Sequence, residues 1–180
     1  MIDSDFKLEK YGLFVRLVNE NDSQFILNLR TDPNLSKYIN STENDIEKQI
    51  NWIREYKIRE KNGKDYYFIY SQNGEYIGLN RIYNINGKVG TSGSWVCKPN
   101  IPYELTWLTV VIIREIFFEV LNLDIDIFDT RKENKKVIRM HHLLGAHKIY
   151  ENEIDVFHYL TKEDFKKSKP KFLQYINYKG

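Results

Sequence analysis

His141 is the side chain of this sequence that is best suited to proton transfer near neutral pH. Val137, His141 and Leu144 recur at helical spacing and share one helix face, which directs the imidazole inward. An imidazole titrates near neutrality, so it could act as a general acid or carry a proton away from a reacting group. A hydrogen-bonded histidine of the core explains the same pattern equally well, and the adjacent His142 is the alternative donor.

Asp129 and Cys97 are the other candidate reactive groups. Asp129 lies near the end of a predicted strand and could accept a proton directly or through water, although a solvent-facing strand acid is the simpler interpretation. Cys97 is the only cysteine, which excludes an intrachain disulfide and a cysteine-based zinc cluster. Its thiol could serve as a nucleophile, but a small buried strand residue is the more economical interpretation. We expect no metal site.

The stretch from Gly93 to Ala146 must position these groups. Residues 89–97 alternate as a strand, and the helix after them carries apolar side chains at steps of three and four from Leu105 to Val120. Residues 124–130 form the next strand, and a last helix follows over 134–144. A strand, one helix and another strand within this length make a crossover unit, so the two strands should run parallel.

The first half of the chain predicts antiparallel strands with two helices. The turn sequence Gln72-Asn73-Gly74-Glu75 indicates a hairpin, and Ser41-Thr42-Glu43-Asn44-Asp45 indicates a helix start whose hydroxyls cap free N–H groups. We interpret the charged tail after Thr161 as a solvated face. The remaining expected strands are 13–18, 66–70, 76–82, 148–150 and 155–160, and the expected helices are 23–29 and one from Ile46 that stops near Asn62.

Composition is that of an ordinary globular protein. The 180 residues fit one domain over 1–180, with 42% hydrophobic and 29% charged residues. The 27 basic and 25 acidic residues leave a net charge of +2, too small an excess for a nucleic-acid partner. No signal-peptide pattern opens the sequence, and Arg114 and Glu115 interrupt its longest apolar stretch. We therefore expect a cytoplasmic protein without a membrane partner.

The predicted order β-αα-βββ-α-β-α-ββ resembles the GNAT superfamily of N-acetyltransferases over nearly the whole chain. The segment Gly93-Ser94-Trp95-Val96-Cys97-Lys98-Pro99 is similar to the family's fourth strand. Asn134, followed by a helix that closes on Leu144-Gly145-Ala146, is similar to its last motif, and glycine suits a left-handed helix stop. The resemblance implies an α/β (α+β) fold, with a mixed central sheet of six to seven strands and helices on both faces.

Two early segments resemble one branch of the superfamily, which acylates amino sugars carried on nucleotides in bacterial surface-polysaccharide synthesis. They are Leu29-Arg30-Thr31-Asp32-Pro33 and Trp52-Ile53. The resemblance implies transfer of an acetyl or short hydroxyacyl group from acyl-CoA to the amine of a dTDP- or UDP-linked amino-deoxysugar. The amine would attack the thioester directly, for synthesis of O-antigen or another surface glycan. Two alternatives stay open, a protein N-terminal or ribosomal-protein acetyltransferase and a non-catalytic domain that binds coenzyme A. A homodimer is common among such enzymes.

The resemblance also implies a place for coenzyme A, as a cosubstrate and with no cofactor bound permanently. The pantetheine arm would lie between two splayed strands, and the pyrophosphate would lie at the N-terminus of the central helix. The loop from Asn100 to Thr106 lacks the glycines that the family uses there, so loss of the coenzyme site is the alternative. The implied residues are Trp95, Val96, Cys97, Tyr103, Glu104, Leu105, Thr106 and Asn134.

Catalytic and acceptor residues are implied in the same way. The family often places a tyrosine acid in the last helix, and His141 stands there by register with Asn134 and Gly145. The usual glutamate of the fourth strand is missing from Thr91-Ser92-Gly93, which leaves Asp129 as the candidate base. The implied acceptor ligands are Arg30, whose fork suits a diphosphate, together with Asn80 and Arg81, although a structural role is as common for each.

Overall fold

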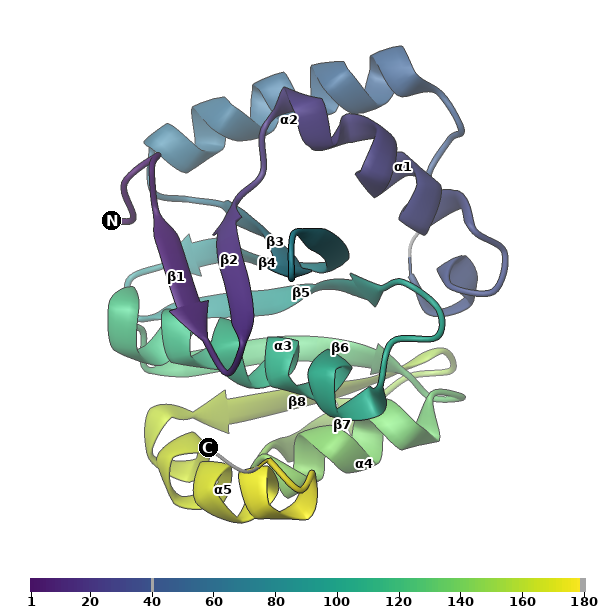
Figure 1. The fold of residues 1–180 in the computed structure, drawn as a ribbon. Coiled ribbons are helices and arrows are strands. Elements are labelled where there is room, and N and C mark those ends of the chain that lie inside the picture. Colours follow the sequence, from purple (N-terminus) through teal and green to yellow (C-terminus); the bar gives the residue numbers. More distant parts are fainter. Residues whose placement is uncertain (40, 179–180) are drawn as a thin grey trace.

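One mixed sheet of eight strands organises residues 1–39 and 41–178, which the computed structural model describes (Figure 1). Its strand order is β1-β2-β3-β4-β5-β6-β8-β7, and only β5 and β6 pair in parallel. The strands are β1 (Lys7–Lys10), β2 (Leu13–Leu17), β3 (Tyr66–Gln72), β4 (Glu75–Asn86), β5 (Val89–Cys97), β6 (Ile125–Arg131), β7 (His147–Glu151) and β8 (Asp155–Thr161). The helices are α1 (Ser23–Thr31), α2 (Ile46–Lys61), α3 (Tyr103–Glu115), α4 (Lys135–Leu143) and α5 (Lys162–Tyr175), with short helical turns η1 (Glu20–Asp22), η2 (Ser36–Tyr38) and η3 (Ile116–Val120).

This architecture confirms the predicted α/β fold and the parallel crossover, and it adds two elements. Strand β1 raises the number of strands to eight, one more than the largest number predicted from the sequence. Its sequence Lys-Leu-Glu-Lys has little apolar signal because it is an edge strand with half of its residues exposed. Helix α5 lies in the charged tail, where Phe165 and Phe172 are buried while Lys166 and Lys171 remain exposed. The tail thus has the expected solvated face, on a helix that was not predicted.

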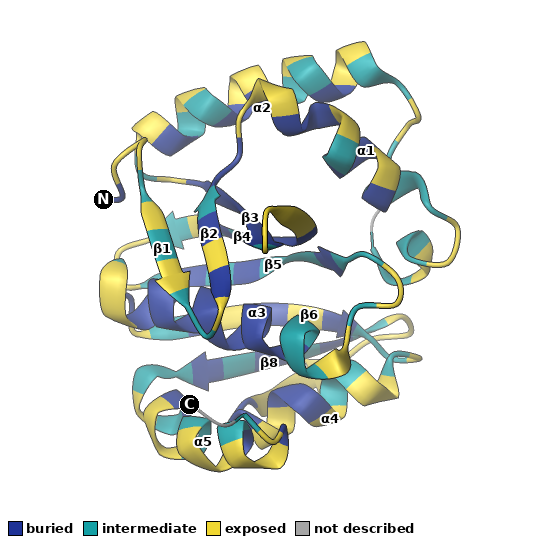
Figure 2. Ribbon diagram, in the orientation of Figure 1, coloured by how far each residue is buried: buried dark blue, intermediate teal, exposed yellow. Residues whose placement is uncertain are grey.

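Two clusters of buried side chains pack on the two faces of the sheet. The smaller cluster joins α1 and α2 to β3, β4 and β5, and the larger joins α3, α4 and α5 to the sheet. Strand β3 contributes side chains to both clusters, because successive residues of a strand point to opposite faces of the sheet. Phe68 and Tyr70 belong to the larger cluster, and Tyr67 and Ile69 belong to the smaller one. Figure 2 shows buried residues along α3 and the central strands, with exposed ones on the outer faces of α2 and α5.

Helix α3 is buried almost all round, as expected for a central helix covered on several sides. All its residues from Trp107 to Glu115 are buried, including Arg114 and Glu115 at 2% exposure each. Buried charges need partners inside the protein. Glu115 accepts from the Tyr11 hydroxyl at 2.7 Å and pairs with Lys10 at 3.0 Å and with Lys169 at 2.9 Å. The β1 hairpin and α5 therefore supply the partners of this buried carboxylate.

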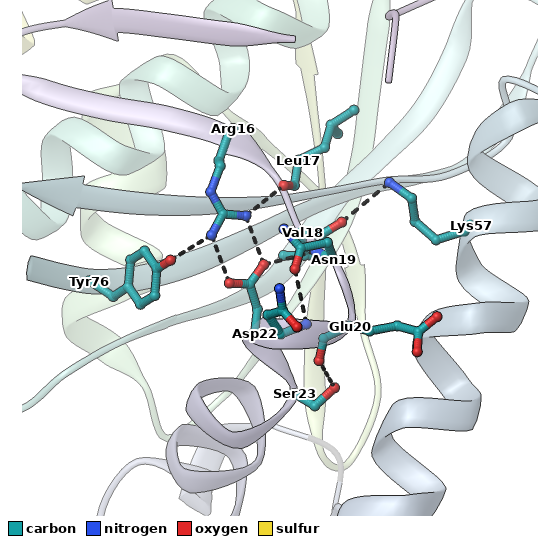
Figure 3. A network of polar contacts seen from close by, with 10 residues as sticks. Arg16, Leu17, Val18, Asn19, Glu20, Asp22, Ser23, Lys57 and Tyr76 are labelled. Carbon is teal, nitrogen blue, oxygen red and sulfur yellow. Dashed lines mark hydrogen bonds and ion pairs between the residues drawn. The ribbon is translucent and has the colours of Figure 1, made fainter. Parts of the chain in front are cut away.

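The two helices of the first half are tied to the sheet by polar contacts (Figure 3). The Arg16 guanidinium on β2 donates two 2.7 Å hydrogen bonds to the Asp22 carboxylate, and one to the Tyr76 hydroxyl at 2.6 Å. Lys57 on α2 donates to the Val18 carbonyl at 3.3 Å. The start of α2 differs from the sequence expectation, because the Asp45 carboxylate and not a hydroxyl of Ser41 or Thr42 caps it, accepting from the Lys48 N–H.

Helix α4 begins and ends as its sequence predicts. The Asn134 side chain caps its first turn, and Gly145 follows it with φ of +93°. A Cβ atom at Gly145 would lie 2.7 Å from the Ser168 side chain and 2.9 Å from the Asp164 carbonyl oxygen, so α5 can approach only a glycine here. Within the described ranges, none of the helices is both long enough and apolar enough to cross a bilayer.

Candidate active site

A cleft of about 470 Å³ opens where β5 and β6 separate. The two strands pair only at Val89 with Ile125 and at Gly90 with Asp126. Farther along, β5 bulges, since Ser94 and Trp95 stand against Asn80 alone on β4 and Ser94 has φ of +51°. The splayed ends of β5 and β6, the inner side of α3 and the first turns of α4 then enclose the cleft.

Strands β5 and β6 separate because the Asp126 side chain takes the place of the next backbone hydrogen bond between them. The Asp126 carboxylate on β6 accepts the Ser92 backbone N–H at 2.7 Å and the Ser92 hydroxyl at 2.6 Å. Behind it, the Arg114 guanidinium of α3 lies 3.7 Å from the same carboxylate. Burial raises the pKa of the Asp126 carboxyl above its ordinary value, and Arg114 and the two Ser92 hydrogen bonds limit this rise by favouring the carboxylate. Asp126 is thus a charged wedge at the closed end of the cleft.

His141 points inward as predicted and lines the cleft with 8% of its surface exposed. Its Nδ1 lies 3.2 Å from Nη2 of Arg114, and its ring packs 4.6 Å from the ring of Phe128. Burial lowers the pKa of His141 well below its ordinary value of 6.5, and Arg114, His158 and His142 lower it further. The ring is therefore neutral at pH 7, which differs from the near-neutral titration that the sequence alone suggests.

His158 of β8 lies behind His141 and should make stability depend on pH. It is fully buried and stacks on Phe128 at 5.3 Å, and burial lowers its pKa to about 4. Between that value and the unfolded value of 6.5 the unfolded chain binds more protons, so stability falls as the pH drops through this window. We expect His158 to contribute a loss of about 3 kcal/mol in unfolding free energy from pH 7 to pH 4.

Urea titrations at several pH values can check this loss. The His158→Phe variant should show a shallower decline in unfolding free energy than the wild type, by that amount. Asn51→Ala, which changes an exposed and uncharged residue of α2, should keep the wild-type slope. Equal slopes for wild type and His158→Phe would contradict the expected contribution of His158.

Asp129 lines the same cleft near the end of β6 and is exposed to solvent within it. Partial burial raises its pKa, and the Asp155 charge raises it further while Arg131 lowers it. A carboxylate with a raised pKa is a stronger base. The placement suits the proton-accepting role proposed from the sequence, which stays a prediction.

Five of the eight coenzyme A candidates line the cleft, namely Trp95, Val96, Cys97, Thr106 and Asn134. The Trp95 indole N–H donates to Thr109 on α3 at 3.0 Å, which fixes the bulged strand against the helix. Burial raises the pKa of the Cys97 thiol to about 12, so the thiol stays protonated and is a poor nucleophile.

The other three candidates, Tyr103, Glu104 and Leu105, form the first turn of α3 outside the cleft lining. Their N–H groups lack intrahelical partners, as at any helix start. The Thr106 N–H differs, because it already donates to the Pro102 carbonyl at 3.2 Å. The backbone N–H groups of Tyr103, Glu104 and Leu105 are therefore left for an anion.

The predicted acceptor ligands surround two adjoining pockets. Arg30 lines both and donates from Nε to the Thr42 hydroxyl at 2.7 Å. Asn80 lines the cleft but is only 2% exposed, and its oxygen accepts the Arg81 backbone N–H. Arg81 lines the second pocket only, where the Asp65 carboxylate holds its guanidinium.

The second pocket has a volume of about 350 Å³ and lies between α1, α2 and the sheet. Its aromatic walls are Trp52, Tyr67 and Tyr83, and the Arg81 guanidinium lies over the rings of Trp52 at 5.1 Å and Tyr83 at 4.7 Å. None of the described residues that line it is acidic. We call it the acceptor pocket.

Several residues of the site were not predicted. Lys98, Arg131 and Lys136 join Arg30 and Arg114 on the cleft wall, where Asp129 is the one acidic residue among the described residues. Ser92 and Asp126 form the wedge. A signal for Arg114 exists in the sequence, since a charge within an otherwise apolar helix requires a buried partner. Within residues 1–39 and 41–178, no three His, Cys, Asp or Glu side chains converge in a way that could hold a metal ion.

Sheet order, splayed strands and cleft define an acyltransferase scaffold, and the sequence matches the corresponding family. Residues 13–147 match the model of the acetyltransferase (GNAT) domain, and the chain belongs to this family. It is an acyl-CoA-dependent N-acetyltransferase that uses acetyl-CoA as a cosubstrate and has no permanent cofactor. No curated protein sequence matches the chain significantly.

Among solved structures, the chain is similar to apo FdhC, described as a nucleotide-linked sugar GNAT. The two are 33% identical, with a TM-score of 0.84 and coverage of 98% of this chain and 99% of FdhC. Two other structures share the fold at lower identity. They are the ribosomal-protein-S5-alanine acetyltransferase of Vibrio fischeri (18% identity, TM-score 0.75, 89% and 99% coverage) and the spermidine N-acetyltransferase of Vibrio cholerae in complex with CoA and spermine (16%, 0.73, 87% and 99%).

Proposed function

We propose that this enzyme acylates the amine of an amino-deoxysugar linked to a nucleotide of the dTDP or UDP type. The acceptor pocket carries the proposal, because it combines Arg30 and Arg81 with three aromatic walls and has no acid among its described lining residues. Arginines suit a diphosphate, and aromatic rings suit a nucleobase or a sugar face. The similarity to FdhC supports the same class of acceptor.

The charge of the pocket argues against a polyamine acceptor. A polycation such as spermidine needs carboxylates near its ammonium groups, whereas the described lining of the acceptor pocket has none and carries Arg30 together with Arg81, which is paired with Asp65. A protein N-terminus is the other alternative acceptor. Its peptide backbone carries no negative charge that two arginines could bind. The likeness to the spermidine and ribosomal-protein enzymes extends to the fold alone.

In the proposed reaction the uncharged acceptor amine attacks the thioester carbonyl from the side of the acceptor pocket. Asp129 accepts the amine proton directly or through water, and His141 stabilises charge on the thioester side. Coenzyme A lies along Trp95, Val96 and Cys97, with its phosphates toward the N-terminus of α3 and the lysines of the cleft. Acetyl is the family's acyl group, and a short hydroxyacyl group is a further candidate.

We place the reaction in the cytoplasm, as a step in the synthesis of O-antigen or another surface glycan. Nucleotide-linked sugars and acyl-CoA are both cytoplasmic metabolites, which supports this assignment. A homodimer is the assembly that we would test first.

Release of free thiol from acetyl-CoA and 3-hydroxybutyryl-CoA should test the acceptor class. We expect turnover with dTDP- or UDP-linked amino sugars, and much less with spermidine or with a peptide that has N-terminal alanine. Arg30→Met should raise KM for the nucleotide sugar about 10-fold or more, because one charge-assisted contact is lost, and leave KM for acyl-CoA unchanged.

Arg54→Met is the matched control, since Arg54 is an exposed arginine of α2 that pairs with Glu20. It should leave both KM values unchanged. Turnover on the peptide or on spermidine, without turnover on any nucleotide sugar, would refute the proposed acceptor.

A further inference from the structure

A buried row of polar side chains crosses the molecule beneath the cleft. Ser92 of β5, Asp126 of β6, Arg114 of α3 and His141 of α4 follow one another, and each is at most 8% exposed. The joining distances are 2.6 and 2.7 Å from Ser92 to Asp126, 3.7 Å from Asp126 to Arg114, and 3.2 Å from Arg114 to His141. The Arg114 guanidinium of α3 thus contacts side chains of β6 and α4, and Asp126 extends the row to Ser92 of β5.

The chemistry of this row determines which nitrogen of His141 carries the proton. A guanidinium has donors only, so the contact between Arg114 and Nδ1 requires Nδ1 to accept. In a neutral ring the proton then lies on Nε2. A second proton on Nδ1 would break this hydrogen bond and place two cations side by side in the interior.

The other groups around the ring do not reverse this preference. Arg114 faces it from α3, Phe128 and Asp126 lie on β6, His158 faces it from β8, and His142 is its neighbour on α4. Asp126 is the one charge among them that would favour an imidazolium, and Arg114 lies between it and the ring. Burial is the main cause of the lowered pKa of His141, and the Arg114 charge lowers that pKa further.

We infer that Arg114 is a positioning residue that holds His141 as a neutral Nε2–H tautomer, so that His141 acts as a hydrogen-bond donor and not as an imidazolium acid. This inference rests on the proposed place of His141 beside the thioester. A neutral imidazole can polarise a carbonyl or stabilise a leaving group in this way. Asp126 and Ser92 hold Arg114 in turn.

The transfer step balances without a proton from His141. The acceptor nitrogen forms a bond to the thioester carbon, and the carbonyl oxygen takes the electron pair of its π bond. The C–S bond then breaks, the thiolate leaves with that bond's electron pair, and the C=O bond re-forms. The amine proton passes to Asp129 or to solvent, and the thiolate takes a proton from water. Nε2–H donates to the oxygen or the sulfur while these carry charge.

Histidine ¹⁵N labelling and two-bond ¹H–¹⁵N correlation spectra test the tautomer directly. The chain has four histidines, and single His→Gln variants assign their signals. At pH 7 we expect His141 to show an unprotonated Nδ1 and a protonated Nε2, and to keep this pattern down to pH 5. Acetyl-CoA should shift the Nε2 signal. A proton on Nδ1, or an imidazolium at pH 7, would overturn the tautomer, and an Nε2 signal that acetyl-CoA leaves unmoved would overturn its place at the thioester.

Variants test the role of Arg114. In Arg114→Met/Asp126→Asn, which removes both charges, His141 should exchange between tautomers and its titration midpoint should rise toward the ordinary value of about 6.5. The kcat of this double variant at pH 7 should fall at least about 10-fold, and kcat should depend on pH in a way that it does not in the wild type. The control Arg16→Met/Asp22→Asn removes a remote pair and should leave the His141 signals unchanged.

A folded Arg114→Met/Asp126→Asn variant with wild-type His141 signals would refute the inference. If that variant does not fold, the wild-type spectrum still decides it. The spectra need no acceptor, so failure of every nucleotide sugar as a substrate would remain a separate result.

Discussion

His141→Phe should lower kcat about 100- to 1,000-fold, which is the usual effect of removing one preorganised donor from a charged transition state. Phenylalanine keeps the ring against Phe128, so packing changes little. KM for acetyl-CoA should stay near the wild-type value because the donor acts after binding. Steady-state thiol release with the best acceptor gives both constants.

Two further variants define what His141 does. His142→Ala changes the neighbouring histidine and should keep kcat within a few-fold of the wild type. His141→Gln carries an oxygen that can accept from Arg114 and an N–H that can donate, although it cannot transfer a proton at neutral pH. It should therefore recover part of the activity that His141→Phe loses. A large loss in His142→Ala, with full activity in His141→Phe, would move the role to His142.

Asp126→Ala should destabilise the fold by about 3 to 5 kcal/mol, because it leaves the Arg114 guanidinium buried without a counter-charge. The change also removes the acceptor of the Ser92 N–H and hydroxyl, both of which are buried. Urea unfolding followed by tryptophan fluorescence would give the free energy.

Two comparisons show whether the buried charge is the cause. Glu43→Ala breaks a pair of exposed side chains with Lys48 and should change the unfolding free energy far less than Asp126→Ala. Arg114→Met/Asp126→Asn removes both buried charges together and should cost less than Asp126→Ala alone. If Asp126→Ala lowered the free energy of unfolding as little as Glu43→Ala, Asp126 and Arg114 would not form a buried charged pair.

The sequence predicts best those elements whose apolar residues recur without interruption. Helix α3, the β3–β4 hairpin and strands β5, β6 and β8 are close to their predicted ranges, because local periodicity and turn residues specify them. Strand β1 and helix α5 were missed for a common reason. Each contributes few apolar side chains, and much of its stability comes from contacts far away in sequence, such as those of Lys10 and Lys169 with Glu115.

The site residues divide in the same way, into features that a local sequence pattern predicts and features that depend on contacts between distant residues. The inward direction of His141 follows from helical spacing and is confirmed, whereas its catalytic role stays a prediction. The neutral state of its ring depends on Arg114, 27 residues away, and the opening of the strands depends on Asp126, 34 residues from Ser92. No local pattern joins these residues. Arg114 interrupts an apolar run of the sequence, and its isolation among apolar residues is the one local signal of its buried role.

The wedge at Asp126 limits how this enzyme can be re-engineered for other acyl donors. The carboxylate that separates β5 from β6 also holds the guanidinium that orients His141. A substitution that widens the cleft at its closed end would therefore also disturb the orientation of the His141 hydrogen-bond donor. Selection for longer acyl chains should avoid this end and collect changes around Leu35, Tyr38 and Ile39, which line the cleft apart from the buried row.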